Sequence, residues 1–432
     1  MSSQSKGILP FAEPVSHTRG ISPYYNESHI KLREFVKRYV EDELAPFAQG
    51  WEKNGEIPHS VLKRHAELGF MINSPPLEAY LDGLKLPAGV PPQEWDEFHT
   101  LTVNDQMSRL GYLGVLWGLG GGNAIGLPPV INFGTEEQKR RFIPKASRGE
   151  IRFCLGITEP DAGSDVAGIR TTAERRGNKY IVNGCKKWIT NGIWADYCTA
   201  AVRTGGAGAG GISVLVVPLK VKGVACTRLE NSGVAASGST FIEFDDVEVP
   251  ISNLVGKENE GFKIIMSNFN PERLGLSCTA LRLARTCLTD AFSHALTRTT
   301  FGQPLITHQI IRSKFTTCAR LIEPAYAFLE QLVFLIRQSR LNPTHEDPQP
   351  GGMTALLKIM STKALEETVR ECQQVMGGLG YSKSLGGRGA RIEQISRDVR
   401  VLVVGGGSEE IMSDLVLRLE MGRVGMGVKA KL

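Results

Sequence analysis

The feature of this sequence that most restricts its fold is a hydrophobic periodicity that changes twice along the chain. Up to about residue 150, apolar residues recur at the three- and four-residue intervals of amphipathic helices. From there to about residue 255 they form short β-prone runs between glycine-rich turns, and beyond it the helical spacing returns. This order predicts an α+β protein with a helical domain at 1–150, a β domain at 151–255 and a second helical domain at 256–432.

Within these segments, the periodicity locates individual elements. An apolar stripe at 32–40 predicts a helix that Pro46 ends. Strands are expected at 179–182, 211–217 and 240–244, and long helices at 274–297, 308–339 and 354–376.

Composition narrows the functional classes. Hydrophobic residues make up 41% and charged residues 22% of the chain, as in an ordinary globular protein. The formal charge of +5 is spread without long runs of like charge, so we expect no nucleic-acid partner. The 8 cysteines include no C-x-x-C pair and no metal-ligand spacing, so we expect free thiols and no bound metal. The longest apolar run, 212–219, is far too short for a membrane span.

The ends of the sequence bear on its cellular location. The first residues contain no apolar core and acquire acidic residues early, so neither a secretory nor a mitochondrial leader is expected. The last three residues, Ala430-Lys431-Leu432, are a conservative variant of the Ser-Lys-Leu peroxisomal signal. We therefore expect a peroxisomal protein, or a cytoplasmic one if this tripeptide is not read as an address.

Two stretches carry most of the chemistry. Residues 156–168, GITEPDAGSDVAG, combine hydroxyls with small residues, so their backbone amides can approach a flat cofactor or a phosphate. The alternative for this stretch is a glycine-rich β-turn with an aspartate-led cap. Residues 187–192, KWITNG, place Trp188 two residues from a hydroxyl and before an Asn-Gly turn. The alternative for this second stretch is a hairpin with a buried tryptophan.

These stretches and five further motifs, in unbroken order from about residue 25 to 425, resemble the acyl-CoA dehydrogenase family of flavoproteins. The further motifs are FGTEEQK at 133–139, FDDVEVP at 244–250, RTTFG at 298–302 with Gln309, QVMGGLGY at 374–381, and Arg397-Asp398. The resemblance implies an N-terminal helical domain, a middle β-barrel or sandwich and a C-terminal four-helix bundle. It also implies a homotetramer, a dimer of dimers, in which each FAD contacts two subunits.

The resemblance implies two sets of FAD-binding residues. The flavin set is Leu155, Ile157, Thr158, Gly163, Ser164, Trp188, Thr190, Ser408 and Glu410. The set for the pyrophosphate and adenine end, supplied mainly by a neighbouring subunit, is Arg298, Phe301, Gln309, Gln374, Gly377 and Gly378. A guanidinium suits a pyrophosphate. The alternative for Arg298 is a solvated charge at a helix end.

The catalytic base is inferred from a missing side chain. Many family members carry a glutamate where this chain has Gly406, whereas long-chain and isovaleryl-type members take their base from an earlier helix. The matching residue here is Glu272, and Asn270-Pro271 before it predicts a helix that starts at this point. A first-turn glutamate that interacts with the helix dipole is the alternative. Glu409 and Glu410 are the rival bases.

The acyl-CoA substrate is implied to contact Ser164, Arg273 and Gly407. The segment 233–240 departs from the family pattern, because it has Ala235 and Gly238 where many members carry an arginine and an aspartate. Acyl length and substituents are not fixed by these residues, since packing among helices sets the length of the acyl cavity.

The resemblance therefore implies an FAD-dependent acyl-CoA dehydrogenase that introduces an α,β double bond into its substrate. The implied electron acceptor is an electron-transferring flavoprotein or molecular oxygen. The first alternative is a flavin oxidase or desaturase of a specialised, secondary-metabolite substrate. The second is a flavin-loaded protein that associates with DNA, which the weak basic charge disfavours.

Overall fold

The computed structural model describes residues 9–72, 75–342, 351–384 and 386–426. These residues form two compact units. The first takes the described residues within 1–49, 96–113 and 273–428, and the second those within 50–95 and 114–272. The predicted domain boundaries at 150 and 255 stay a prediction. The tripeptide Ala430-Lys431-Leu432 lies outside the described residues.

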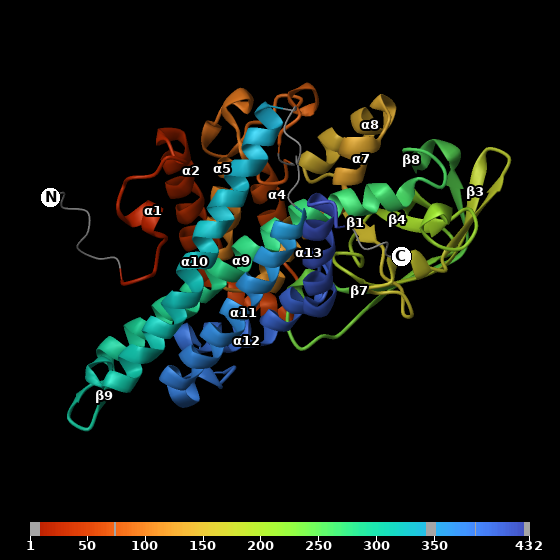
Figure 1. Ribbon diagram of the computed structural model, residues 1–432. Coiled ribbons are helices and arrows are strands. Elements are labelled where there is room, and N and C mark those ends of the chain that lie inside the picture. Colours follow the sequence, from red (N-terminus) through yellow and green to blue (C-terminus); the bar gives the residue numbers. More distant parts are fainter. Residues whose placement is uncertain (1–8, 73–74, 343–350, 385, 427–432) are drawn as a thin grey trace. The chain divides into compact units, whose positions relative to one another are not determined.

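The first unit is helical (Figure 1). Its helices are α1 (Val15–Thr18), α2 (Glu27–Arg38), α5 (Glu97–Ser108), α10 (Gln309–Leu341), α11 (Gly351–Met376), α12 (Gly387–Val404), α13 (Glu409–Arg423) and, from Arg273 onward, α9 (Gly261–Thr297). Helix α11 packs against α10, α12 and α13, while α5 packs against α2 and α10. Buried apolar side chains of α5, α9, α10 and α11, among them Phe98, Leu281, Leu329 and Leu357, form one core.

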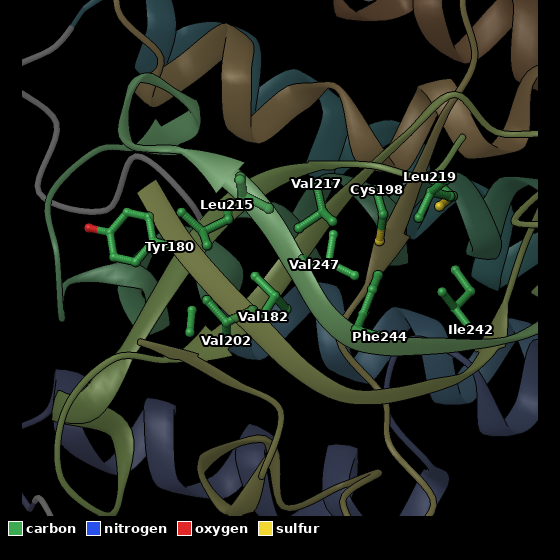
Figure 2. Close-up of a cluster of buried hydrophobic side chains, with 14 of the residues drawn as sticks. Tyr180, Val182, Cys198, Val202, Leu215, Val217, Leu219, Ile242, Phe244 and Val247 are labelled. Atoms are coloured by element: carbon green, nitrogen blue, oxygen red, sulfur yellow. The ribbon is translucent and has the colours of Figure 1, made fainter. Parts of the chain in front are cut away.

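The second unit contains an 8-stranded mixed sheet. Its strands are β1 (Phe153–Gly156), β2 (Thr172–Arg176), β3 (Lys179–Ile189), β4 (Tyr197–Arg203), β5 (Ile212–Pro218), β6 (Val224–Arg228), β7 (Thr240–Pro250) and β8 (Leu254–Val255). Their order is β6-β7-β3-β2-β4-β5-β8, with β1 paired in parallel to β4. Figure 2 shows the apolar cluster that these strands bury, including Tyr180, Val217 and Phe244.

Helices α7 (Pro128–Phe133) and α8 (Glu136–Ser147) of the second unit pack on a further apolar cluster of the sheet. The unit also contains α4 (His59–Glu67) and, from Gly114 onward, α6 (Leu113–Gly126). Phe142 of α8 meets Phe153 of β1 edge to face, with ring centroids 5.4 Å apart. The predicted α+β class, with N-terminal helices, a middle sheet and C-terminal helices, is confirmed. Among the described residues, no helix has both the length and the apolar character that crossing a membrane requires.

The prediction that Pro46 ends the first long helix is wrong. Helix α2 continues into a π-helical turn, Tyr39–Leu44, and then into α3 (Ala45–Asn54), whose first turn contains Pro46. In the π-helical turn the backbone pairs at a longer interval, since Ala45 N donates to the Val40 carbonyl. Proline is tolerated in such a position because its missing N–H is not needed for an intrahelical bond.

The prediction that a helix starts at Asn270-Pro271 is also wrong. Helix α9 begins at Gly261 and runs without interruption to Thr297, with Pro271 in its interior. The turns before the proline bury Ile264 and Ile265 against the sheet of the second unit. Burial of such side chains stabilises by about 1.5–3 kcal/mol each. That gain offsets the cost of an interior proline, about 3 kcal/mol.

Helices α2 and α5 begin with linked N-caps. The side chains of Asn26 and Asp96 each accept hydrogen bonds from the first turn of their helix. In return, the backbone N–H of each capping residue donates to Nδ1 of the histidine three residues later, His29 or His99. Asp96 Oδ1 lies 2.9 Å from both His29 Nε2 and His99 Nδ1, and its other oxygen lies 3.1 Å from Arg337 Nε. The side chains of His29, Asp96 and His99 are of kinds that bind metals and lie close enough together to do so. However, the two histidine rings stack with centroids 3.8 Å apart and an arginine lies beside Asp96, which favours a role as shared helix caps.

A buried imidazole in α4 predicts an acid-sensitive fold. Burial lowers the pKa of His65 from 6.5 to about 3, so the folded chain keeps this side chain neutral while the unfolded chain protonates it below pH 6.5. The stability from the neutral form is complete above pH 6.5 and is lost as the pH falls toward 3, by about 1.4 kcal/mol per unit. Urea unfolding at pH 7 and pH 5 should show a smaller pH effect for His65→Leu than for the wild type. An equal change in the free energy of unfolding between pH 7 and pH 5 in the two proteins would contradict this role of His65.

Candidate active site

The predicted flavin loop follows the first strand of the sheet. Leu155 lies in β1, and the chain then leaves the strand with Ile157 buried and Thr158 half-buried. Gly163 and Ser164 are exposed further along the loop. A side chain added at Gly163 would meet nothing within 4 Å, so its backbone is open to a ligand. The structure thus places these five residues in β1 and in the loop that follows it, within the second unit.

A buried ion pair holds this loop to β3. Lys186 Nζ donates to Glu159 Oε1 at 2.7 Å and to the Ile157 carbonyl at 3.1 Å. Glu159 also accepts from the backbone N–H groups of Arg170 (2.6 Å) and Thr171 (3.0 Å). Burial opposes its ionisation, but the Lys186 ammonium keeps the pKa of Glu159 below its usual value. One carboxylate therefore joins three segments behind the loop.

Trp188 is presented by an irregularity in β3. The register between β3 and β7 shifts between Lys186 and Ile189, and Trp188 has a left-handed φ of 66°. Its side chain is 53% exposed, and Lys187 Nζ lies 4.8 Å from its ring centroid. Left-handed backbone at a bulky residue is rare and costs energy, so this shape indicates a functional constraint.

The hairpin interpretation of this stretch is wrong, because β3 pairs with β2 and β7 rather than with β4. Thr190 is half-buried after the strand. Asn191 is buried, and its side chain donates to the carbonyls of Trp117 (3.2 Å) and Ser237 (2.8 Å). The turn after Trp188 is therefore anchored to two other segments of the second unit.

The predicted base lies in the interior of α9. Glu272 is half-buried, one residue after Pro271. Its Oε1 accepts a 2.6 Å hydrogen bond from Asn268 Nδ2, one turn earlier. The dipole argument for a first-turn glutamate does not apply, because about three helical turns precede it.

The residues predicted for the adenine end of FAD lie in the first unit. Arg298 follows α9, and Phe301 is 96% exposed in the hairpin of β9 (Thr299–Thr300) and β10 (Gln303–Pro304). Gln309 begins α10. The remaining three residues, Gln374, Gly377 and Gly378, lie at the end of α11 and directly after it. All six are exposed.

Two cations hold the glycine loop between α12 and α13. Lys358 Nζ donates to the carbonyls of Val403 (2.5 Å) and Gly407 (2.6 Å), and Arg273 Nε donates to the Gly406 carbonyl (3.0 Å). Burial, and then the charge of Arg273, lowers the pKa of Lys358 to about 8. In a trans peptide the N–H points opposite to the C=O. The N–H groups of Gly407 and Ser408 therefore point away from the two cations.

The remaining predicted residues lie in or next to this glycine loop between α12 and α13. Gly406 has a φ of 69°, so glycine suits this position. Ser408 is the N-cap of α13, and Glu410 is exposed in its first turn with a lowered pKa, first from a backbone hydrogen bond. The rival base Glu409 forms an ion pair of 2.7 Å with Lys363. Arg273, predicted to contact substrate, is buried against this loop.

Sequence reasoning missed Lys186, Asn268 and Lys358. A signal existed for Lys186, because it lies an even number of residues after Tyr180 and Val182 and is therefore expected on the same, buried face of the strand. A lysine on the buried face of a strand is rare unless it is paired. Asn268 and Lys358 gave no such signal, since the carbonyls to which they donate, those of Ile125, Val403 and Gly407, lie far away in sequence.

Comparisons with known proteins cover nearly the whole chain. Models of the acyl-CoA dehydrogenase N-terminal, middle and C-terminal domains match residues 26–150, 154–247 and 259–420. Acyl-CoA dehydrogenase AFT10-1 of Alternaria alternata is 50% identical over 94% of this chain and 94% of that protein. Acyl-CoA dehydrogenase apdG of Emericella nidulans is 42% identical over 95% and 94%.

A solved structure agrees with these matches. The crystal structure of an acyl-CoA dehydrogenase from Mycobacterium smegmatis superposes with a TM-score of 0.83 at 32% identity, covering 94% of this chain and 100% of that one. The family's enzymes are FAD-dependent oxidoreductases. Three domain matches in order, together with a relative that is 50% identical over 94% of the chain, show that this chain belongs to the acyl-CoA dehydrogenase family.

Proposed function

We propose that this chain oxidises the α,β carbon–carbon bond of an acyl-CoA thioester, with Glu272 as the base that removes the α-proton. The observation that carries the proposal is the setting of Glu272. It is a half-buried carboxylate, in the same unit as the open flavin loop and the exposed Trp188. Partial burial keeps a carboxylate basic, and access to substrate lets it act.

The residues present fit FAD. The flavin loop offers a backbone without side-chain obstruction at Gly163, and Trp188 offers an exposed aromatic face. Arg298 offers a guanidinium for a pyrophosphate, and Phe301, three residues later in the chain, offers an exposed aromatic ring. Gly377 and Gly378 are likewise open, with nothing within 4 Å of an added Cβ. The bound FAD supplies the acceptor for the hydride that leaves the β-carbon.

The chain's own residues then act on the thioester. Glu272 accepts the α-proton on a carboxylate oxygen. Within the first unit, the N–H groups of Gly407 and Ser408, backed by Lys358 and Arg273, suit an oxygen on which negative charge develops. We include Ser164 as a further contact for the CoA portion of the substrate.

We propose a homotetramer, a dimer of dimers, in which one subunit completes the FAD site of another. Support comes from large apolar side chains that are exposed and lie within a few residues, in sequence, of those predicted for the adenine end. These are Phe301, Ile310, Leu379 and Tyr381. Aromatic side chains are enriched at protein interfaces.

Anaerobic bleaching of the flavin absorbance tests the proposed function. The purified, FAD-loaded protein is mixed with a panel of CoA thioesters that differ in length, branching and polar substituents. At least one should bleach the flavin and yield the 2-enoyl product by mass spectrometry. A protein that binds FAD but is bleached by none of them contradicts the proposal.

The electron acceptor is tested in the same preparation. We propose an electron-transferring flavoprotein or molecular oxygen. About one hydrogen peroxide per turnover in air identifies an oxidase, whereas turnover that depends on an added flavoprotein identifies a dehydrogenase.

We also propose a peroxisomal location, on the sequence of the last three residues. A fluorescent protein fused to the N-terminus should give puncta that coincide with a peroxisomal marker. Removal of Ala430-Lys431-Leu432 should disperse the signal. Diffuse fluorescence from the intact fusion would contradict this location.

A further inference from the structure

Asn268 lies one helical turn before Glu272 on α9 and is 7% exposed. Its side-chain nitrogen Nδ2 donates to Glu272 Oε1 at 2.6 Å and to the Ile125 carbonyl at 3.1 Å. Asn268 is thus a buried amide placed between the predicted base and the backbone of helix α6.

The bond to Ile125 fixes which way this amide faces. A backbone carbonyl only accepts hydrogen bonds, so the NH₂ group, and not the amide oxygen, must face Ile125. The two hydrogens of that NH₂ group then serve the two acceptors. If the Asn268 amide rotated away from Glu272, the Ile125 carbonyl would also lose its hydrogen bond from Asn268.

The carbonyl of Ile125 is itself held in place. Ile125 is the second-last residue of α6, where carbonyls have no intrahelical partner. The adjacent Gly126 carbonyl accepts a 2.6 Å bond from Thr199 Oγ1 in β4. The end of α6 therefore rests on the sheet and provides a rigid anchor for Asn268.

We propose that Asn268 is a positioning residue for the base: it holds the carboxylate of Glu272 in one rotamer and favours its ionised form. The inference rests on the proposed role of Glu272. A simple helix-surface pair at this spacing stabilises by only a few tenths of a kcal/mol and leaves both side chains mobile. Burial and the second bond to Ile125 distinguish this pair from such a contact.

Asn268→Asp tests the proposal most sharply, because it keeps the shape and replaces the donor with a second carboxylate. Two carboxylates at this distance do not both ionise readily, so they share a proton. Flavin reduction in a single turnover is measured from pH 5 to 10 with a substrate from the panel. We expect the pH of half-maximal rate to rise by ~1 unit or more and the rate at pH 7 to fall ~10–100-fold.

Asn268→Ser provides a second variant that adds no charge. Its shorter hydroxyl reaches one acceptor at most, so we expect a ~10-fold loss of rate with a smaller pH displacement. FAD content and the dissociation constant for acyl-CoA, measured by titration, should match the wild type in both variants. If Asn268→Asp does not fold, the serine variant alone decides the outcome.

Asn253→Asp is the matched control. Asn253 is also buried in the second unit, and its Nδ2 donates to the Val216 carbonyl at 2.7 Å. It should leave the pH of half-maximal rate unchanged, whatever its effect on stability. Unchanged rate and pH profile in Asn268→Asp or Asn268→Ser would overturn the inference. Full activity of Glu272→Gln would instead overturn the proposed base, which keeps the two failures distinct.

Discussion

Glu272→Gln is expected to slow reduction of the bound flavin by ~100-fold or more, the scale of a lost general base. Glutamine keeps the volume of the side chain and a hydrogen-bonding group, but it cannot accept the α-proton. FAD and acyl-CoA should therefore bind as in the wild type. Stopped-flow absorbance of the flavin at saturating substrate measures the rate without interference from the electron acceptor.

Glu409→Gln serves as the control for this prediction. Glu409 is the rival base, but its carboxylate is engaged 2.7 Å from Lys363. We expect less than ~3-fold change in flavin reduction for this variant, since loss of a partly exposed ion pair has a small effect. If the two variants exchange their effects, the base has been assigned to the wrong carboxylate.

Arg298→Ala is expected to weaken FAD binding by ~10–100-fold, as the loss of a hydrogen bond to a charged group implies. Because the proposed site is completed by a neighbouring subunit, the same change should lower the mass of the assembly. Flavin absorbance after gel filtration measures the first effect, and light scattering measures the second.

Arg320→Ala is a suitable comparison, since Arg320 is an exposed arginine on α10 with no predicted cofactor role. It should retain both FAD and the native mass. An Arg298→Ala protein that remains tetrameric with a full complement of FAD contradicts the shared site. A wild-type monomer that binds FAD fully contradicts it as well.

The order of helical, β and helical segments could be predicted because hydrophobic spacing is a local property. The long helices at 308–339 and 354–376 correspond closely to α10 and α11. The two failures concern Pro46 and Pro271, where a strong local signal for a helix end or start was overridden. In both places apolar side chains of the flanking turns are buried, which a sequence pattern does not reveal.

The candidate site likewise contains features that could be predicted from the sequence and features that could not. Residues in contiguous motifs, such as the flavin loop and the Trp188 stretch, could be located from the sequence. The Trp188 backbone shape could not, because it results from a register shift against β7. Nor could the partnership of Asn268 with Ile125, which lie 143 positions apart.

The left-handed backbone at Gly406 limits how the reaction chemistry of this lineage can evolve. A glutamate there would require a conformation that costs about 1–2 kcal/mol for an L-residue. Its Cβ would also lie 2.9 Å from Leu276 Cδ1. A single substitution would therefore introduce a strained acid before that acid could replace Glu272. The contact is with the end of a leucine side chain, which can shift, so the left-handed backbone is the main cost of placing the proton acceptor at position 406.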